Sequence, residues 1–138
     1  MSIPKDLARI HAAAFTQERH WSEIEFRDLL QSPTCFCVSH AHGFALGRVI
    51  FDEAELLTIA VLPDFQGRGF GKNLLSDFED RAVKLVAKQA FLEVADDNIS
   101  AKKVYKTEGY ICSGTRAKYY KRRDGSFVDA NIFTRTLT

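Results

Sequence analysis

Residues 66–71 read Gln66-Gly67-Arg68-Gly69-Phe70-Gly71, a glycine-rich stretch between an apolar run and a segment with helical periodicity. Glycines let a backbone approach a ligand without interference from side chains. The helix that follows presents unpaired N–H groups and the positive end of its dipole, which together favour a bound phosphate or pyrophosphate. Arg68 and Lys72 would add positive charge at the rim. The structural alternative is a glycine-rich turn that permits tight packing.

Two other phosphate-binding motifs fit this stretch less well. A P-loop requires Gly-Lys-Ser/Thr, whereas Gly71-Lys72 is followed by Asn73. The dinucleotide fingerprint requires G-x-G-x-x-G after the first strand of a βαβ unit, whereas these glycines follow G-x-G-x-G late in the chain. Glu93 lies at a distance that suits a ribose-binding carboxylate. A nicotinamide-dependent oxidoreductase is therefore weakened as an alternative without being excluded.

The segments before the glycine stretch predict two helices and three strands. The first helix spans residues 5–15, and the second begins at a capping box of Ser22 and Glu25, with Trp21 and Phe26 as a hydrophobic staple. The second helix should end near Ser32-Pro33, because the residue before a proline avoids helical angles. Strands are predicted at 34–39, 43–51 and 55–62, and their short connections favour antiparallel pairing.

The segments after the glycine stretch predict two helices and three strands. A helix over 70–88 leads to a short apolar strand at 90–94, which suits burial on both faces. Asp97 or Asn98 can cap another helix that ends near Gly109. Two final strands are predicted at 110–117 and 128–136. We therefore expect one domain over 1–138, of mixed α/β or α+β class, with about six strands in a central mixed sheet flanked by helices.

Composition narrows the class of protein. A chain of 138 residues with a formal net charge of +1 suits one domain and gives no broad attraction to nucleic acid or membranes. It has no apolar run long enough to span a bilayer and no signal-peptide stretch, so we expect a cytoplasmic protein. Its three cysteines include no CxxC pair, and its four histidines lack metal-ligand spacing. Neither a disulfide framework nor a metal site is expected.

The glycine stretch resembles the GNAT N-acetyltransferase superfamily, whose signature is Q/R-x-x-G-x-G/A between a strand and a helix. Gln66-x-x-Gly69-x-Gly71 matches it. The resemblance implies the GNAT fold, with acetyl-CoA as the acetyl donor and no metal. It also implies that main-chain amides of the loop hold the pyrophosphate and that strand residues 59–61 pair with the pantetheine arm. Two parallel strands would then splay apart around the thioester.

Within that superfamily, four stretches resemble the RimI-type ribosomal-protein alanine N-acetyltransferases. They are Trp21-Ser22-Glu23; residues 52–71; Leu92-Glu93-Val94 with Asn98, Ala101, Tyr105 and Gly109-Tyr110; and Arg116-x-x-Tyr119-Tyr120 with Gly125 and Asp129-Ala130. This resemblance implies that the acceptor is a protein N-terminal amine, that of ribosomal protein S18. A lysine side chain or a small amine is the alternative acceptor within the same chemistry.

The resemblance also implies roles for single residues. Glu93 matches the general base, Tyr105 the general acid that protonates the leaving thiolate, and Asn98 a contact to the pantetheine arm. The implied cofactor-binding set is Ile59, Ala60, Val61, Gln66, Gly67, Arg68, Gly69, Phe70, Gly71, Lys72 and Asn98. Each role has a structural alternative: Glu93 as a solvated or paired strand-end carboxylate, Asn98 as a helix cap and Tyr105 as a core aromatic.

Three departures from the family pattern leave the acceptor open. The first helix begins so early that the first family strand is expected to be missing. Ala95 stands where RimI-type chains often have arginine, and the segment 16–20 is longer than its counterpart. No cysteine falls beside Glu93, so direct transfer is favoured over a cysteine-based route. The alternative from another functional class is a non-catalytic coenzyme A-binding module.

Overall fold

The structure is a computed structural model that describes residues 3–15 and 19–137. Its strands form one six-stranded mixed sheet in the order β1-β2-β3-β4-β6-β5. The elements are α1 (Ile3–Ala14), α2 (Glu23–Gln31), β1 (Cys35–His40), β2 (Gly43–Ile50), β3 (Glu53–Val61), the 3-10 turn η1 (Pro63–Phe65), α3 (Phe70–Lys84), β4 (Gln89–Ala95), α4 (Ile99–Thr107), β5 (Ile111–Lys121) and β6 (Phe127–Thr136). This architecture confirms the predicted mixed α and β class.

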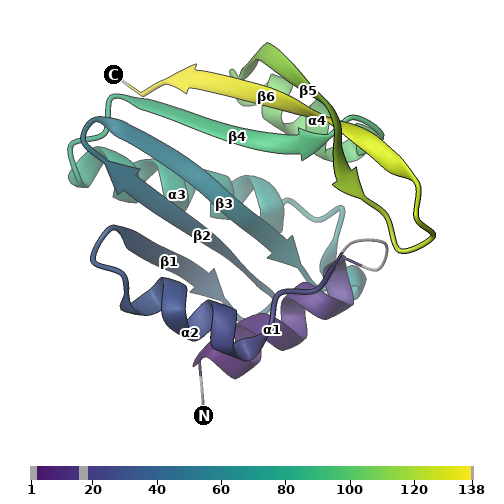
Figure 1. Cartoon of the computed structure of the whole chain (residues 1–138). Coiled ribbons are helices and arrows are strands. Elements are labelled where there is room, and N and C mark those ends of the chain that lie inside the picture. The colour runs from purple at the N-terminus through teal and green to yellow at the C-terminus, as the bar shows by residue number, and fades with distance from the viewer. Residues whose placement is uncertain (1–2, 16–18, 138) are drawn as a thin grey trace.

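Helices cover both faces of the sheet (Figure 1). On one face, α1 and α2 bury Leu7, Ile10 and Phe26 against β2 and β3. On the other face, α3 and α4 bury the larger cluster, which includes Phe78 and Tyr105. Because apolar side chains of one strand alternate between the two faces, a single sheet supports both clusters.

The capping box predicted at the start of α2 is confirmed. The N–H of Glu25 donates to Ser22 Oγ, and the N–H of Ser22 donates to Glu25 Oε1, both at 3.1 Å. The predicted staple is present as well, with the rings of Trp21 and Phe26 5.6 Å apart. These contacts fix where α2 begins and how the chain enters it.

The parallel strands β3 and β4 open into a gap. They pair only along residues 53–56 and 89–92, and beyond this point Figure 1 shows them diverging. In addition, Leu46 pairs with Thr58 while Gly47 pairs with Leu56, so Leu57 is an extra residue that bulges β3. The parallel pairing and the splay, both implied by the family resemblance, are confirmed.

The predicted helix over 70–88 is wrong at its C-terminal end, because α3 stops at Lys84. Val86 has a φ of 72°, a left-handed conformation usually left to glycine. The N–H of Ala87 then donates to the carbonyl of Ala82 at 3.0 Å, which closes the helix end. The chain carries a valine where a glycine would have indicated this end.

Two strands extend past a predicted end by two residues or more. β3 begins at Glu53 rather than at residue 55, because Phe51, with a φ of 56°, and Asp52 suffice to turn the chain. β5 continues to Lys121 rather than ending at residue 117, because an irregular stretch interrupts its pairing without ending it. α1 begins at Ile3, which is the first described residue.

Candidate active site

The glycine loop joins η1 to α3 through two left-handed residues. Gly67 and Gly69 have φ values of 76° and 84°, which strain any residue with a Cβ. Gly69 is the N-cap of α3 and supplies no side-chain cap. The first N–H groups of the helix therefore face the loop without a side-chain acceptor, and an anionic ligand can fill that role.

The space around the loop glycines rules out the tight-packing alternative. A Cβ added to Gly67, Gly69 or Gly71 would meet no heavy atom within 4 Å. By contrast, a Cβ on Gly43 would lie 2.5 Å from the carbonyl oxygen of Ala60, and one on Gly47 would lie 2.6 Å from Phe78. Packing thus requires glycine in β2, whereas the loop glycines leave open space for a ligand.

A cavity of about 460 Å³, here called the loop-side cavity, adjoins the glycine loop. Its lining includes most of the predicted cofactor-binding residues: Ile59, Ala60, Val61, Gln66, Gly67, Gly69, Gly71, Lys72 and Asn98. The side-chain amide of Gln66 donates to the carbonyl of Val61 at 3.0 Å and so ties the loop to the end of β3.

Two predicted residues of the loop do not line this cavity. The guanidinium of Arg68 lies over the ring of Phe65, 5.4 Å from its centroid. The ring of Phe70 packs beside those of His40 and Phe65, with centroids 5.0 and 6.2 Å away. The side chains of Arg68 and Phe70 therefore support the loop rather than line the cavity.

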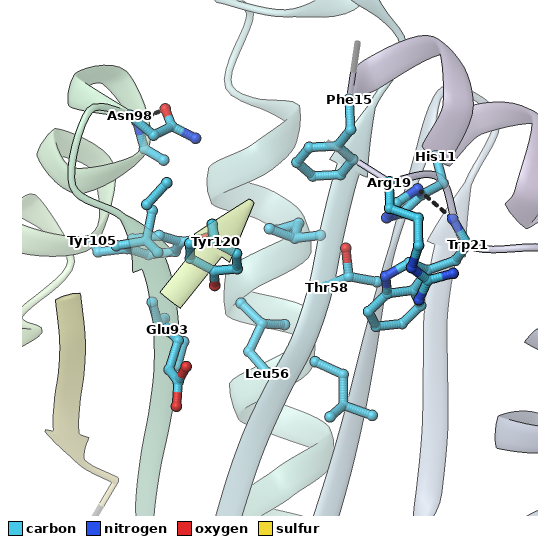
Figure 2. Close-up of a pocket in the computed structure, with 16 residues that line it drawn as sticks. His11, Phe15, Arg19, Trp21, Leu56, Thr58, Glu93, Asn98, Tyr105 and Tyr120 are labelled. Atoms are coloured by element: carbon cyan, nitrogen blue, oxygen red, sulfur yellow. Dashed lines mark hydrogen bonds between the residues drawn. The ribbon is translucent and has the colours of Figure 1, made fainter. Parts of the chain in front are cut away.

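A second cavity of about 180 Å³, here called the inner cavity, fills the gap between β3 and β4. Glu93 and Tyr105 both line it, so the structure brings the predicted base and acid together. Figure 2 shows them with Tyr120 on one side, facing Phe15, His11, Arg19 and Trp21 on the other. The two cavities share five lining residues: Phe15, Ile59, Asn98, Ala101 and Tyr105.

Glu93 is a paired carboxylate that also faces the inner cavity. It lies on β4 opposite Ile132 of β6, and its side chain is 17% exposed. Arg116 of β5 approaches it at 3.3 Å. The ion-pair alternative is therefore correct as a description of its contacts, and it does not conflict with a role in proton transfer.

Tyr105 is both a core aromatic and a cavity residue. It is 7% exposed and packs against Tyr110 and Phe133, with ring centroids 5.9 and 6.3 Å away. Burial raises the pKa of Tyr105, so its hydroxyl stays protonated at neutral pH. The described part of the chain offers that hydroxyl no hydrogen-bond partner. It is available as a donor to a ligand in the cavity.

Asn98 caps α4, as its structural alternative stated. Its Oδ1 accepts from the N–H of Ala101 at 3.2 Å and from the hydroxyl of Ser100 at 3.3 Å. The same residue lines both cavities. The cap fixes its position at their junction.

Sequence reasoning placed the segment 16–20 beside the acceptor pocket but missed the rest of the far wall of the inner cavity. This wall consists of Phe15, His11, Arg19 and Trp21. His11 is 3% exposed, and its Nδ1 accepts from the N–H of Trp21 at 3.4 Å. A signal was present, since His11 lies four residues after the buried Leu7 and therefore on the apolar face of α1.

The longer segment 16–20 is described only in part, since residues 16–18 lie outside the described ranges. Arg19 donates to both carboxylate oxygens of Glu25, at 2.7 and 2.9 Å. This bond lowers the pKa of Glu25 to about 2. Arg19 is thereby held at the start of α2, beside the inner cavity.

His11 predicts a pH dependence of stability. Burial, with Arg19 and His20 nearby, lowers its pKa from 6.5 to about 4. As pH falls below 6.5, the unfolded state binds the proton first, so the free energy of unfolding should fall. The expected loss is about 2–3 kcal/mol by pH 4.5. Denaturant titrations from pH 7.5 to 4.5 measure this slope, which should flatten in His11→Phe. An equal slope in both proteins would contradict the assignment.

Neither a membrane span nor a metal cluster is found in the described ranges. No helix there combines the length and apolar character needed to cross a bilayer. No group of three or more His, Cys, Asp or Glu side chains there is arranged to hold a metal ion.

Known proteins share this sequence pattern and fold. The model of the acetyltransferase (GNAT) family matches residues 3–110. The [ribosomal protein bS18]-alanine N-acetyltransferase of Escherichia coli (strain K12) is 38% identical over 83 residues, covering 60% of this chain and 56% of the relative. The N-alpha-acetyltransferase RimI of Mycobacterium tuberculosis is 33% identical over 123 residues, covering 83% of this chain and 76% of the relative.

A solved structure is similar to this chain over a longer span than the sequence comparison with the Escherichia coli relative covers. The crystal structure of the ribosomal-protein-S18-alanine N-acetyltransferase from Escherichia coli superposes with a TM-score of 0.87 at 29% identity. The superposition covers 98% of this chain and 88% of that chain. In the sequence comparison, the chain spans little more than half the length of its Escherichia coli relative, 56%.

Proposed function

This chain belongs to the acetyltransferase (GNAT) family, and from that membership we propose that it transfers an acetyl group from acetyl-CoA to an amine. One observation carries the proposal. The open glycine loop lines the loop-side cavity, which adjoins the inner cavity, and Glu93 and Tyr105 both line that inner cavity. A phosphate site and a proton-transfer pair joined by one channel suit a long, phosphate-bearing acyl donor.

We assign donor binding to the loop and to the end of β3, which pairs with β2 but not with β4. The N–H groups at the start of α3 would bind the pyrophosphate, and Lys72 would add charge at the rim. Residues 59–61 are not paired to β4, so their backbone groups are free on that side to bond the pantetheine arm. A backbone N–H near Val61 would polarise the thioester carbonyl.

Glu93 would act as the general base. An amine attacks a thioester only when neutral, so its ammonium form must lose a proton, which the Glu93 carboxylate would accept directly or through water. A C–N bond then forms at the acetyl carbon as the C–S bond breaks. Tyr105 would donate the proton that converts the leaving thiolate to a thiol. No covalent intermediate with the protein is needed.

The proposed acceptor is a protein N-terminal α-amine, as the names of the relatives describe for those proteins. A free α-amino group has a pKa of roughly 7.7–8.0, whereas that of lysine is about 10.4, so a single carboxylate suffices more readily for the α-amine. By the same similarity, the proposed partner is the N-terminus of ribosomal protein bS18, with lysine or small amines as the alternatives.

Mass spectrometry of an amine panel tests this function. The panel holds the bS18 N-terminal peptide, the same peptide with its N-terminus blocked and a lysine free, and a polyamine, each with saturating acetyl-CoA. We expect one added acetyl group on the free N-terminus alone. Acetylation of lysine or the polyamine only would overturn the acceptor. Coenzyme A binding without any acetylated product would favour a non-catalytic binding module.

A further inference from the structure

The hairpin of β5 and β6 contains a wide irregularity beside the inner cavity. Arg116 pairs with Ala130, and Tyr120 pairs with Val128. Residues 117–119 of β5 therefore lie opposite the single residue Asp129 of β6. We call residues 117–119 the hairpin bulge. Bulges re-aim side chains and are over-represented beside active sites.

The bulge is held by a defined contact. Lys118 has a φ of 52°, a left-handed conformation that costs energy for a residue with a side chain. Its N–H donates to Asp129 Oδ1 at 2.8 Å, so the carboxylate satisfies the amide that the bulge removes from the ladder. The ring of Tyr119 then lies under the Arg116 guanidinium, 5.1 Å from its centroid.

The bulge changes the positions of the Arg116 and Tyr120 side chains relative to each other. Arg116 and Tyr120 are four positions apart in sequence, yet their partners on β6 are only two positions apart. A regular strand rises about 3.4 Å per residue, so the bulge shortens this separation along the sheet by about 7 Å. Arg116 can thus pair with Glu93 while Tyr120 still lines the inner cavity, where Figure 2 shows it beside Tyr105.

The geometry points to Asp129 as a positioning residue for the acceptor: it holds the hairpin bulge that places Arg116 on Glu93 and Tyr120 in the inner cavity. Asp129 does not line either cavity and acts only through these two residues. This inference rests on the proposed function, since it assigns the hairpin to the acceptor side of the same site. The glycine loop, which would bind the donor, lies on the opposite side of the gap and should be unaffected.

The test measures kcat/KM for the acceptor peptide and the Kd for coenzyme A in Asp129→Ala and in Asp129→Asn. Loss of the carboxylate should lower kcat/KM for the acceptor peptide by at least about tenfold, the low end of the loss expected for one hydrogen bond to a charged group. The Kd for coenzyme A should stay within about twofold. Asp129→Asn retains an oxygen acceptor and should restore most of the acceptor kinetics.

A second pair of variants, both at Lys118, removes the lysine charge in each case but has opposite effects on the backbone conformation. Lys118→Val disfavours positive φ and should reproduce the loss seen in Asp129→Ala, whereas Lys118→Gly adopts positive φ freely and should not. This pair decides the matter if Asp129→Ala fails to fold. Unchanged acceptor kinetics in Asp129→Ala or Lys118→Val would overturn the inference, as would an equal loss for both substrates. A wild-type protein without any acetyl transfer would instead overturn the proposed function.

Discussion

Replacing Glu93 with glutamine is expected to lower kcat by about 10³-fold, within the range for loss of a general base. Glutamine keeps the shape of the side chain but cannot accept a proton from the acceptor ammonium. Arg116 is 54% exposed and can be solvated when its partner is lost, so folding should survive. Initial rates of coenzyme A release at saturating acetyl-CoA and acceptor measure the effect.

Glu55→Gln is a matched control for Glu93→Gln. Glu55 is also a strand carboxylate paired with an arginine, since Arg48 approaches it at 2.6 Å, and it lies outside the inner cavity. Its replacement should leave kcat unchanged. If Glu93→Gln retains the wild-type kcat, or if Glu55→Gln loses as much, then Glu93 is not the base.

Replacing Gly71 with leucine is expected to weaken coenzyme A binding by about 100-fold without loss of stability. The new side chain would occupy space that is open in the free protein and that the pyrophosphate requires. Loss of one or two charge-assisted hydrogen bonds accounts for an effect of about this size. The free energy of unfolding should not fall and can rise by up to about 1 kcal/mol, because leucine favours the helix more than glycine does.

Calorimetric titration with coenzyme A and a thermal melt separate these two effects. Ser76→Leu serves as the control, since it adds the same side chain to an exposed position of α3 away from the loop-side cavity. Its affinity for coenzyme A should match that of the wild type. A wild-type affinity in Gly71→Leu would show that the glycine loop does not bind the pyrophosphate.

Much of the fold could be predicted because local signals agree with the final packing. The capping box at Ser22 and the period of the apolar residues in α3 depend on neighbours within one or two turns. The end of α3 was missed because Val86 adopts a left-handed conformation that its β-branched side chain disfavours, so the residue type does not indicate it. The hairpin bulge was missed because Asp129 stabilises it from the adjacent strand, which a local pattern does not show.

In the candidate site, too, some residues could be predicted from the sequence and others could not. The glycine loop was predicted because its function requires a contiguous pattern, and Glu93 and Tyr105 were predicted through the spacing of a family resemblance. The wall of His11 and Trp21 was missed, because only the packing of α1 and α2 over the sheet brings it to β4. Arg68 and Phe70 were included in the binding set as members of the loop, and a linear motif cannot distinguish a side chain that lines the cavity from one that supports the loop.

The most direct measurement of the central claim is a crystal structure with a bisubstrate analogue, in which coenzyme A is joined to the N-terminal nitrogen of an acceptor peptide. We predict that the pyrophosphate contacts the N–H groups of the glycine loop and that the sulfur lies near the Tyr105 hydroxyl. The linked nitrogen should lie within direct or water-mediated reach of the Glu93 carboxylate. An analogue bound outside the gap between β3 and β4, or a nitrogen remote from Glu93, would contradict the account.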